Sequence, residues 1–164
     1  MENIIANLTH QVSVELKKHH LKLVTVESCT GGGLSYFLTN IPGSSDWFER
    51  GLVTYSNEAK MELLNVKANT LEKYGAVSEE TAREMVIGGL KASHANIAVS
   101  ITGIAGPNGG TPDKPVGTVW IGWGDKKKIN TTLYHFDGNR EQVRLQSIIS
   151  ALNELLTFVK KNLP

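Results

Sequence analysis

Apolar residues recur at helical spacing near both ends of the chain. At the amino-terminal end the apolar pattern consists of Ile4, Ile5, Leu8, Val12 and Leu16, and it stops before the polar pair His19 and His20. At the carboxyl-terminal end a broader stripe runs between about Asn139 and Lys161, with Asp137 or Asn139 as its N-cap. These patterns predict two long amphipathic helices. An oligomer contact is open to such stripes, but core packing is their commoner use.

A third helix is predicted from about Glu79 to Ser93, because Ser78 can cap it and Met85, Val86 and Leu90 give it one apolar face. Short runs rich in apolar and β-branched residues lie between the helices. They predict strands at 23–26, 52–55, 97–101, 117–123 and 129–136.

The order of these elements predicts the fold class. Strands alternate with helices first, and the last two strands are separated only by Gly124, Asp125 and three lysines. That short spacing predicts an antiparallel hairpin with a charged tip. We therefore expect residues 1–164 to form one three-layer α/β/α domain, with a mixed, mainly parallel sheet and a late antiparallel hairpin.

Composition narrows the classes of function. The chain has 164 residues and a formal net charge of +1, which gives no basic footprint for nucleic acid or a membrane surface. No apolar run reaches the roughly 18 residues that span a bilayer, and no signal peptide is recognisable, so a cytoplasmic protein is expected. Cys29 is the single cysteine, which excludes an internal disulfide, and the histidines show no metal-ligand spacing. No metal and no cofactor are predicted.

The segment 26–33 reads V-E-S-C-T-G-G-G between a predicted strand and a short helical stretch. This arrangement puts the hydroxyl of Ser28 beside backbone N–H groups, which can stabilise an oxyanion or a phosphate. A plain strand-to-helix turn with Ser28 as a cap fits the shape equally well. Cys29 could itself be a nucleophile near a helix start, although a small apolar filler is the favoured interpretation.

Two further segments combine polar and flexible residues at strand ends. Tyr55 ends a predicted strand, Ser56 can cap a helix, and Lys60 would lie in its first turns, where the helix end and partial burial lower an amine's pKa. A lysine made neutral in this way can act as a general base, but an isolated lysine is more often a solvated surface residue. Thr102 opens a loop with four glycines, Gly103, Gly106, Gly109 and Gly110, which favours a ligand-facing loop over one without function.

Six blocks of the sequence together resemble one known family. They begin at Glu27 (E-S-C-T-G-G), Gly43 (G-S-S-D-W-F), Val53 (V-T-Y-S-N-E-A-K), Gly75 (G-A-V-S), Thr102 (T-G-I-A-G-P) and Lys114 (K-P-V-G-T-V). In this order they are similar to the CinA carboxy-terminal domain family. The resemblance implies hydrolysis of the carboxamide of nicotinamide mononucleotide to nicotinate mononucleotide and ammonia. It further implies Ser28 as the nucleophile, Lys60 as its base and Tyr55 close by.

A mechanism follows as a hypothesis. Neutral Lys60 takes the proton of Ser28, with Tyr55 passing or orienting it, and Ser28 attacks the amide carbon. Backbone N–H groups of Thr30, Gly31 and Gly32, with the Thr102 hydroxyl, would hold the oxyanion.

The substrate phosphate needs separate donors. The loop amides from Gly103 to Gly110, Gly106 among them, and the guanidinium of Arg140 are candidates, although a surface ion pair of Arg140 with Glu141 or a nearby acid is equally plausible. A small-molecule nucleotide is thus the expected partner, neither nucleic acid nor a membrane is expected, and the long terminal helices favour a homodimer. A non-catalytic member that only binds a nucleotide or a partner is the alternative.

Overall fold

A five-stranded sheet in the order β2-β1-β3-β4-β5 forms the middle of the protein. The structure is a computed structural model that describes residues 1–162. Its strands are β1 (Leu23–Glu27), β2 (Phe48–Val53), β3 (Ile97–Gly103), β4 (Thr118–Gly124) and β5 (Ile129–His135). Its helices are α1 (Glu2–Lys18), α2 (Gly33–Leu38), α3 (Asn57–Leu64), α4 (Ala68–Tyr74), α5 (Glu79–Lys91) and α6 (Arg140–Asn162), with a short 3-10 turn at Ser44–Asp46.

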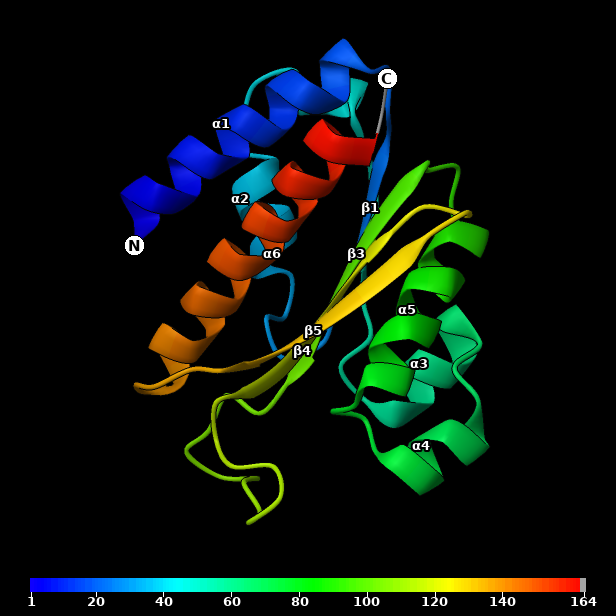
Figure 1. Cartoon of the computed structure of the whole chain (residues 1–164), viewed down its shortest axis with the longest axis vertical. Coiled ribbons are helices and arrows are strands. Elements are labelled where there is room, and N and C mark those ends of the chain that lie inside the picture. The colour runs from blue at the N-terminus through cyan, green and yellow to red at the C-terminus, as the bar shows by residue number, and fades with distance from the viewer. Residues whose placement is uncertain (163–164) are drawn as a thin grey trace.

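Helices cover both faces of the sheet, which confirms the predicted three layers. Helices α1, α2 and α6 lie on one face, and α3, α4 and α5 lie on the other (Figure 1). The strand β1 pairs in parallel with both β2 and β3, whereas β4 pairs antiparallel with β3 and β5. Among the described strands, β4 alone therefore runs against the other four. The predicted mixed sheet with a late hairpin is confirmed.

Several local predictions can be checked against the helix ends. The hydroxyl of Ser78 accepts a hydrogen bond from the Thr81 N–H at 3.1 Å, as predicted for the cap of α5. The cap of α6 is Asn139, whose side chain accepts from the Gln142 N–H at 2.9 Å. Asp137 was the wrong alternative. The Gln142 side chain accepts from the Asn139 N–H at 2.8 Å in return, so the two residues satisfy each other's backbone donors.

The second strand begins earlier than the sequence pattern predicts. It starts at Phe48 and ends at Val53, so Tyr55 lies beyond it. The charged pair Glu49 and Arg50 hides the strand in the sequence, but the two side chains bind each other at 2.8 Å. Because β2 is an edge strand, its polar positions can face solvent. The helix α4 was not predicted either.

The two sides of the sheet have cores of unequal size. The larger one lies between the sheet and α1, α2 and α6, and both terminal helices contribute their apolar stripes to it. On the other side, α5 packs close to the sheet because Gly89 leaves room for Val26, and a Cβ at Gly88 would overlap the Leu64 carbonyl. That close approach fixes α3 against α5, and α3 carries Lys60.

The carboxyl ends of β1, β2 and β3 meet at one edge of the sheet because the three strands are parallel. Ser28 directly follows β1, Tyr55 lies two residues after the end of β2, and Thr102 is the last residue but one of β3. The long loop after β3 projects from the same edge (Figure 1). Within residues 1–162, no helix is both long and apolar enough to cross a membrane.

Candidate active site

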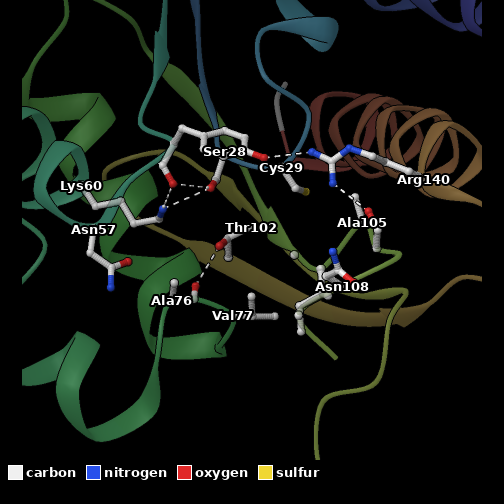
Figure 2. Close-up of a pocket in the computed structure, with 15 residues that line it drawn as sticks. Ser28, Cys29, Asn57, Lys60, Ala76, Val77, Thr102, Ala105, Asn108 and Arg140 are labelled. Carbon is white, nitrogen blue, oxygen red and sulfur yellow. Dashed lines mark hydrogen bonds between the residues drawn. The ribbon is translucent and has the colours of Figure 1, made fainter. Parts of the chain in front are cut away.

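A pocket of about 270 Å³ lies at this edge of the sheet. Its wall combines the turns after β1 and β2, the end of β3 with its glycine-rich loop, the segment before α5 and the start of α6. The side chains of Ser28 and Lys60 point toward one another at its inner end, and Thr102 lies between Ser28 and Ala76 (Figure 2). The sequence stretches predicted to carry chemistry therefore meet in one cavity.

Ser28 and Lys60 form the central contact. The Lys60 Nζ lies 3.1 Å from the Ser28 Oγ, although the residues are far apart in sequence. Ser28 is 8% exposed and Lys60 only 1%. Lys60 is thus a buried residue beside a nucleophile candidate rather than a solvated surface lysine.

The surroundings of Lys60 favour its neutral form. Burial lowers the pKa of Lys60 from its usual value of 10.5, since the charged amine loses hydration. Its Nζ also lies 2.9 Å from the Thr54 carbonyl and 3.2 Å from the Tyr55 carbonyl. A neutral amine has two hydrogens, which these carbonyls can accept. In the neutral form the lone pair is left for the remaining neighbour, the Ser28 hydroxyl, whereas a charged amine would donate to all three.

The local sequence explains how Lys60 comes to this position. The Ser56 hydroxyl accepts from the Ala59 N–H at 3.0 Å and starts α3 directly after the strand-end turn. Lys60 lies one helical turn after Ser56 and so faces back toward the strand ends. The partial positive charge at the amino-terminal end of α3 further destabilises a charged amine at this position.

Tyr55 contributes its backbone to this pair rather than its phenol. Its carbonyl accepts from Lys60 and lies 3.4 Å from the Ser28 Oγ. Its phenol oxygen accepts instead from the Arg140 Nη2 at 3.0 Å. The hypothesis that the Tyr55 side chain passes or orients the proton is therefore not supported by the geometry.

The turn after β1 is organised by a residue that sequence reasoning did not single out. Glu27 is fully buried, and its carboxylate accepts four hydrogen bonds, two from backbone N–H groups of α2 and two from hydroxyls. The donors are the N–H groups of Leu34 and Ser35 and the hydroxyls of Thr30 and Ser35, at 2.6–3.0 Å. The positive start of α2 is thus bound by the protein's own carboxylate. A glutamate at the end of a strand, shortly before a glycine-rich helix start, was the available signal.

The predicted oxyanion donors lie in the same turn. Thr30, Gly31 and Gly32 do not line the pocket, Thr30 is fully buried, and the Gly31 N–H donates to the Ser28 carbonyl at 3.0 Å. The pocket lining therefore gives no support to the predicted role of these N–H groups at the oxyanion. Cys29 does line the pocket, and its backbone N–H forms no hydrogen bond to another described residue. That N–H follows the candidate nucleophile directly.

The thiol of Cys29 fits the predicted role of an apolar filler. Cys29 is 6% exposed and belongs to the larger core. Burial raises the pKa of the Cys29 thiol to about 12, so the thiolate that would attack a substrate is strongly disfavoured.

The loop after β3 lies where the sequence placed it. Thr102, Gly103 and Gly106 all line the pocket. The Thr102 hydroxyl donates to the Ala76 carbonyl at 2.8 Å, so its single hydrogen is not free for an oxyanion, and that part of the hypothesis is wrong. Asn57 and Asn108 also line the cavity, and no role was predicted for their side chains (Figure 2).

Arg140 joins three segments at the mouth of the pocket. Its Nη1 donates to the Gly106 carbonyl at 2.8 Å, and its Nη2 donates to the Tyr55 phenol. It forms no ion pair with Glu141 in the described part of the chain, so the alternative of a surface pair is wrong. No group of three or more His, Cys, Asp or Glu side chains suited to a metal ion occurs within residues 1–162.

Comparison with known proteins finds close relatives. The family model described as the CinA C-terminal domain matches residues 5–159. A protein of Enterobacter agglomerans named nicotinamide-nucleotide amidohydrolase PncC is 50% identical to this chain, and the alignment covers 93% of this chain and 96% of the relative. The protein of the same name from Escherichia coli K12 is 49% identical, with 92% of each chain covered.

A solved structure shares the fold. The crystal structure of the competence/damage inducible protein CihA from Agrobacterium tumefaciens superimposes with a TM-score of 0.93. It is 39% identical and covers 96% of each chain.

Proposed function

The chain belongs to the CinA C-terminal domain family, and from this premise we propose that it is an amidohydrolase that cleaves the carboxamide of nicotinamide mononucleotide. The products are nicotinate mononucleotide and ammonia. The 3.1 Å contact between Ser28 and the buried Lys60 supports this proposal most directly, since a serine beside a neutral amine is a nucleophile with its base.

The first half of the reaction forms an acyl-enzyme. The lone pair of neutral Lys60 takes the proton of the Ser28 hydroxyl as Ser28 Oγ bonds to the carboxamide carbon. The Cys29 N–H, next to the nucleophile, donates to the oxyanion of the tetrahedral intermediate, as the residue after the nucleophile does in other serine hydrolases. The carbon–nitrogen bond then breaks, and the proton held by Lys60 goes to the departing nitrogen, which leaves as ammonia.

The second half releases the acid. Lys60 takes a proton from a water molecule, and the resulting hydroxide attacks the ester carbon. The bond to Ser28 Oγ breaks, Ser28 recovers its proton from Lys60, and nicotinate mononucleotide leaves. Each half of the cycle returns Lys60 to its neutral form, so the low pKa of Lys60 is useful twice.

The glycine-rich loop and Arg140 bind the phosphate in this proposal. The backbone N–H groups of Ala105, Gly106, Asn108 and Gly109 form no hydrogen bonds with described residues and line the pocket. Successive free N–H groups are suited to an anion. Each Nη of Arg140 has a second hydrogen beyond those given to Gly106 and Tyr55, so Arg140 can hold the loop and the phosphate together.

The reaction would belong to pyridine nucleotide salvage, because it converts an amide nucleotide into the corresponding acid. We expect the enzyme to act in the cytoplasm, without metal or cofactor, and as a homodimer. Sedimentation of the pure protein tests the homodimer, and a monomer over the working concentration range would remove it.

Release of ammonia from nicotinamide mononucleotide by the pure protein tests the activity. We expect stoichiometric ammonia and nicotinate mononucleotide, with release unaffected by a metal chelator. Binding of the nucleotide without release would favour the alternative, a non-catalytic member of the family. Neither binding nor release would mean that the substrate is another amide.

A further inference from the structure

The direction of one hydrogen bond limits what Thr102 can do. A carbonyl oxygen has no hydrogen, so in the 2.8 Å contact with Ala76 the Thr102 hydroxyl must be the donor. A hydroxyl has one hydrogen and two lone pairs. Thr102 lines the pocket with Ser28 and is 1% exposed, and its hydroxyl oxygen accepts no hydrogen bond from a described residue, so its lone pairs are shielded from bulk water and available to a ligand.

The main-chain groups in contact with Lys60 and Thr102 are also acceptors. The carbonyls of Thr54 and Tyr55 accept from Lys60, and the carbonyl of Ala76 accepts from Thr102. Together with the Thr102 Oγ1 they form what we call the acceptor wall. Figure 2 shows the Thr102 hydroxyl directed at the Ala76 carbonyl, close to the contact between Ser28 and Lys60.

We propose that Thr102 determines specificity by accepting a hydrogen bond from the –NH₂ group of the substrate carboxamide. The inference rests on the proposed function and adds its leaving-group site. When the carboxamide carbon lies against Ser28, the oxygen points to the Cys29 N–H and the –NH₂ group to the acceptor wall. The departing ammonia, itself a donor, leaves from the same place.

The acceptor wall also separates substrate from product. The acid product replaces the –NH₂ group by a carboxylate oxygen, which has lone pairs and no hydrogen. The lone pairs of the product carboxylate would then face the lone pairs of Thr102 Oγ1. Two acceptors without a donor between them are unfavourable in a buried site. Thr102 therefore favours binding of the amide and release of the acid.

Replacing the hydroxyl by a methyl group of similar size tests this role. Thr102→Val keeps the shape but accepts nothing, whereas the matched control Thr102→Ser keeps both the hydrogen bond to Ala76 and the acceptor. In a Ser28→Ala background, which prevents turnover, the dissociation constants of nicotinamide mononucleotide and nicotinate mononucleotide are measured by calorimetry. Thermal melting checks that each variant is folded.

The decisive measurement is the ratio of the dissociation constants of the amide and the acid, compared between each Thr102 variant and the parent Ser28→Ala protein. Lys60 is the same in all of these proteins, so its effect on the ratio drops out of the comparison. In Thr102→Val we expect amide binding to weaken about three- to tenfold while acid binding is unchanged or tighter. In Thr102→Ser the ratio should stay within about twofold. If Thr102→Val does not fold, Thr102→Ala takes its place with the same expectation.

Two failures can be told apart. An unchanged ratio in a folded Thr102→Val or Thr102→Ala protein overturns the role of Thr102, while ammonia release by the unmodified protein still supports the proposed function. If the unmodified protein releases no ammonia from nicotinamide mononucleotide, the proposed function is wrong and the role of Thr102 falls with it.

Discussion

Two turns with similar layouts put their buried charged side chains to different uses. The turn after β1 follows Glu27, the last residue of that strand, and leads into α2. The turn after β2 leads through Ser56 into α3, which carries Lys60. Both charged side chains are buried. The Glu27 carboxylate is surrounded by four donors and holds the start of its own helix. Lys60 has two carbonyls and a serine, and faces the other turn.

The comparison separates a stabilising charge from a reactive one. The Glu27 carboxylate accepts hydrogen bonds from four donors that would otherwise lack partners. Lys60 forms no ion pair with a carboxylate of any described residue, and burial lowers its pKa. The first turn therefore fixes Ser28 in place, and the second supplies the base that activates it.

Removing the nucleophile should have the largest effect. We expect Ser28→Ala to lower kcat by about 10⁴-fold or more, as in other serine hydrolases, with the fold unchanged. The neighbouring substitution Cys29→Ala is the matched control and should keep kcat within about fivefold. Ammonia release measures both variants. If Cys29→Ala were inactive and Ser28→Ala active, the thiol would be the nucleophile.

Removing the base should have the next largest effect. Lys60→Met should lower kcat by about 10²–10⁴-fold, the usual contribution of a general base. In the unmodified enzyme, kcat should rise with pH through the lowered pKa of Lys60, because only the neutral amine accepts a proton. A pH–rate profile checks this rise. The exposed Lys91→Met serves as the control, and a flat profile in the unmodified enzyme would contradict the role of Lys60.

Substitution of the buried Glu27 should lower the free energy of unfolding as well as the activity. Glu27→Gln places amide hydrogens against donors that the carboxylate now accepts, so we expect a loss of about 2 kcal/mol or more in the free energy of unfolding. Urea denaturation measures it. Glu62→Gln, on the exposed side of α3, should change the free energy by less than about 0.5 kcal/mol. Equal effects of the two substitutions would show that the carboxylate of Glu27 is dispensable.

The buried amine should make stability depend on pH, with the smallest effect of the four. The pKa of Lys60 is lower in the folded chain than in the unfolded one, so between the two values the unfolded chain binds more protons. Stability therefore rises with pH in that window, by up to about 1.4 kcal/mol per pH unit, and the penalty is complete below the folded pKa. Lys60→Met should remove this slope. A slope that survives in Lys60→Met would have another origin.

Much of the architecture could be predicted from the sequence because it follows from local patterns. The terminal helices, α5 with its Ser78 cap and the late hairpin all have periodicity or turn residues that identify them. The edge strand β2 was misplaced, since the pairing of Glu49 with Arg50 leaves no apolar alternation to read. Periodicity describes one element at a time and does not register such pairing.

The site was predictable in its side chains and not in its backbone. Ser28, Lys60 and Thr102 were predicted from segments that follow strand ends, and the family resemblance supported Ser28 and Lys60. Arg140 was one of two interpretations of the start of the last helix. All four residues line the pocket. Which way the glycines after Ser28 face depends on Glu27 taking the donors of α2, and this is a tertiary contact. The phenol of Tyr55 is likewise positioned by Arg140, which is distant in sequence.

The acceptors in contact with Lys60 and Thr102, apart from Ser28, are main-chain oxygens, contributed by Thr54, Tyr55 and Ala76. Substituting a side chain at these positions leaves the oxygen in the chain. A mutational scan would therefore test the side chains at these positions and leave untested the carbonyls that orient the base and the leaving group. Replacing a single backbone amide by an ester, which weakens its carbonyl as an acceptor, would reveal this silent half of the site.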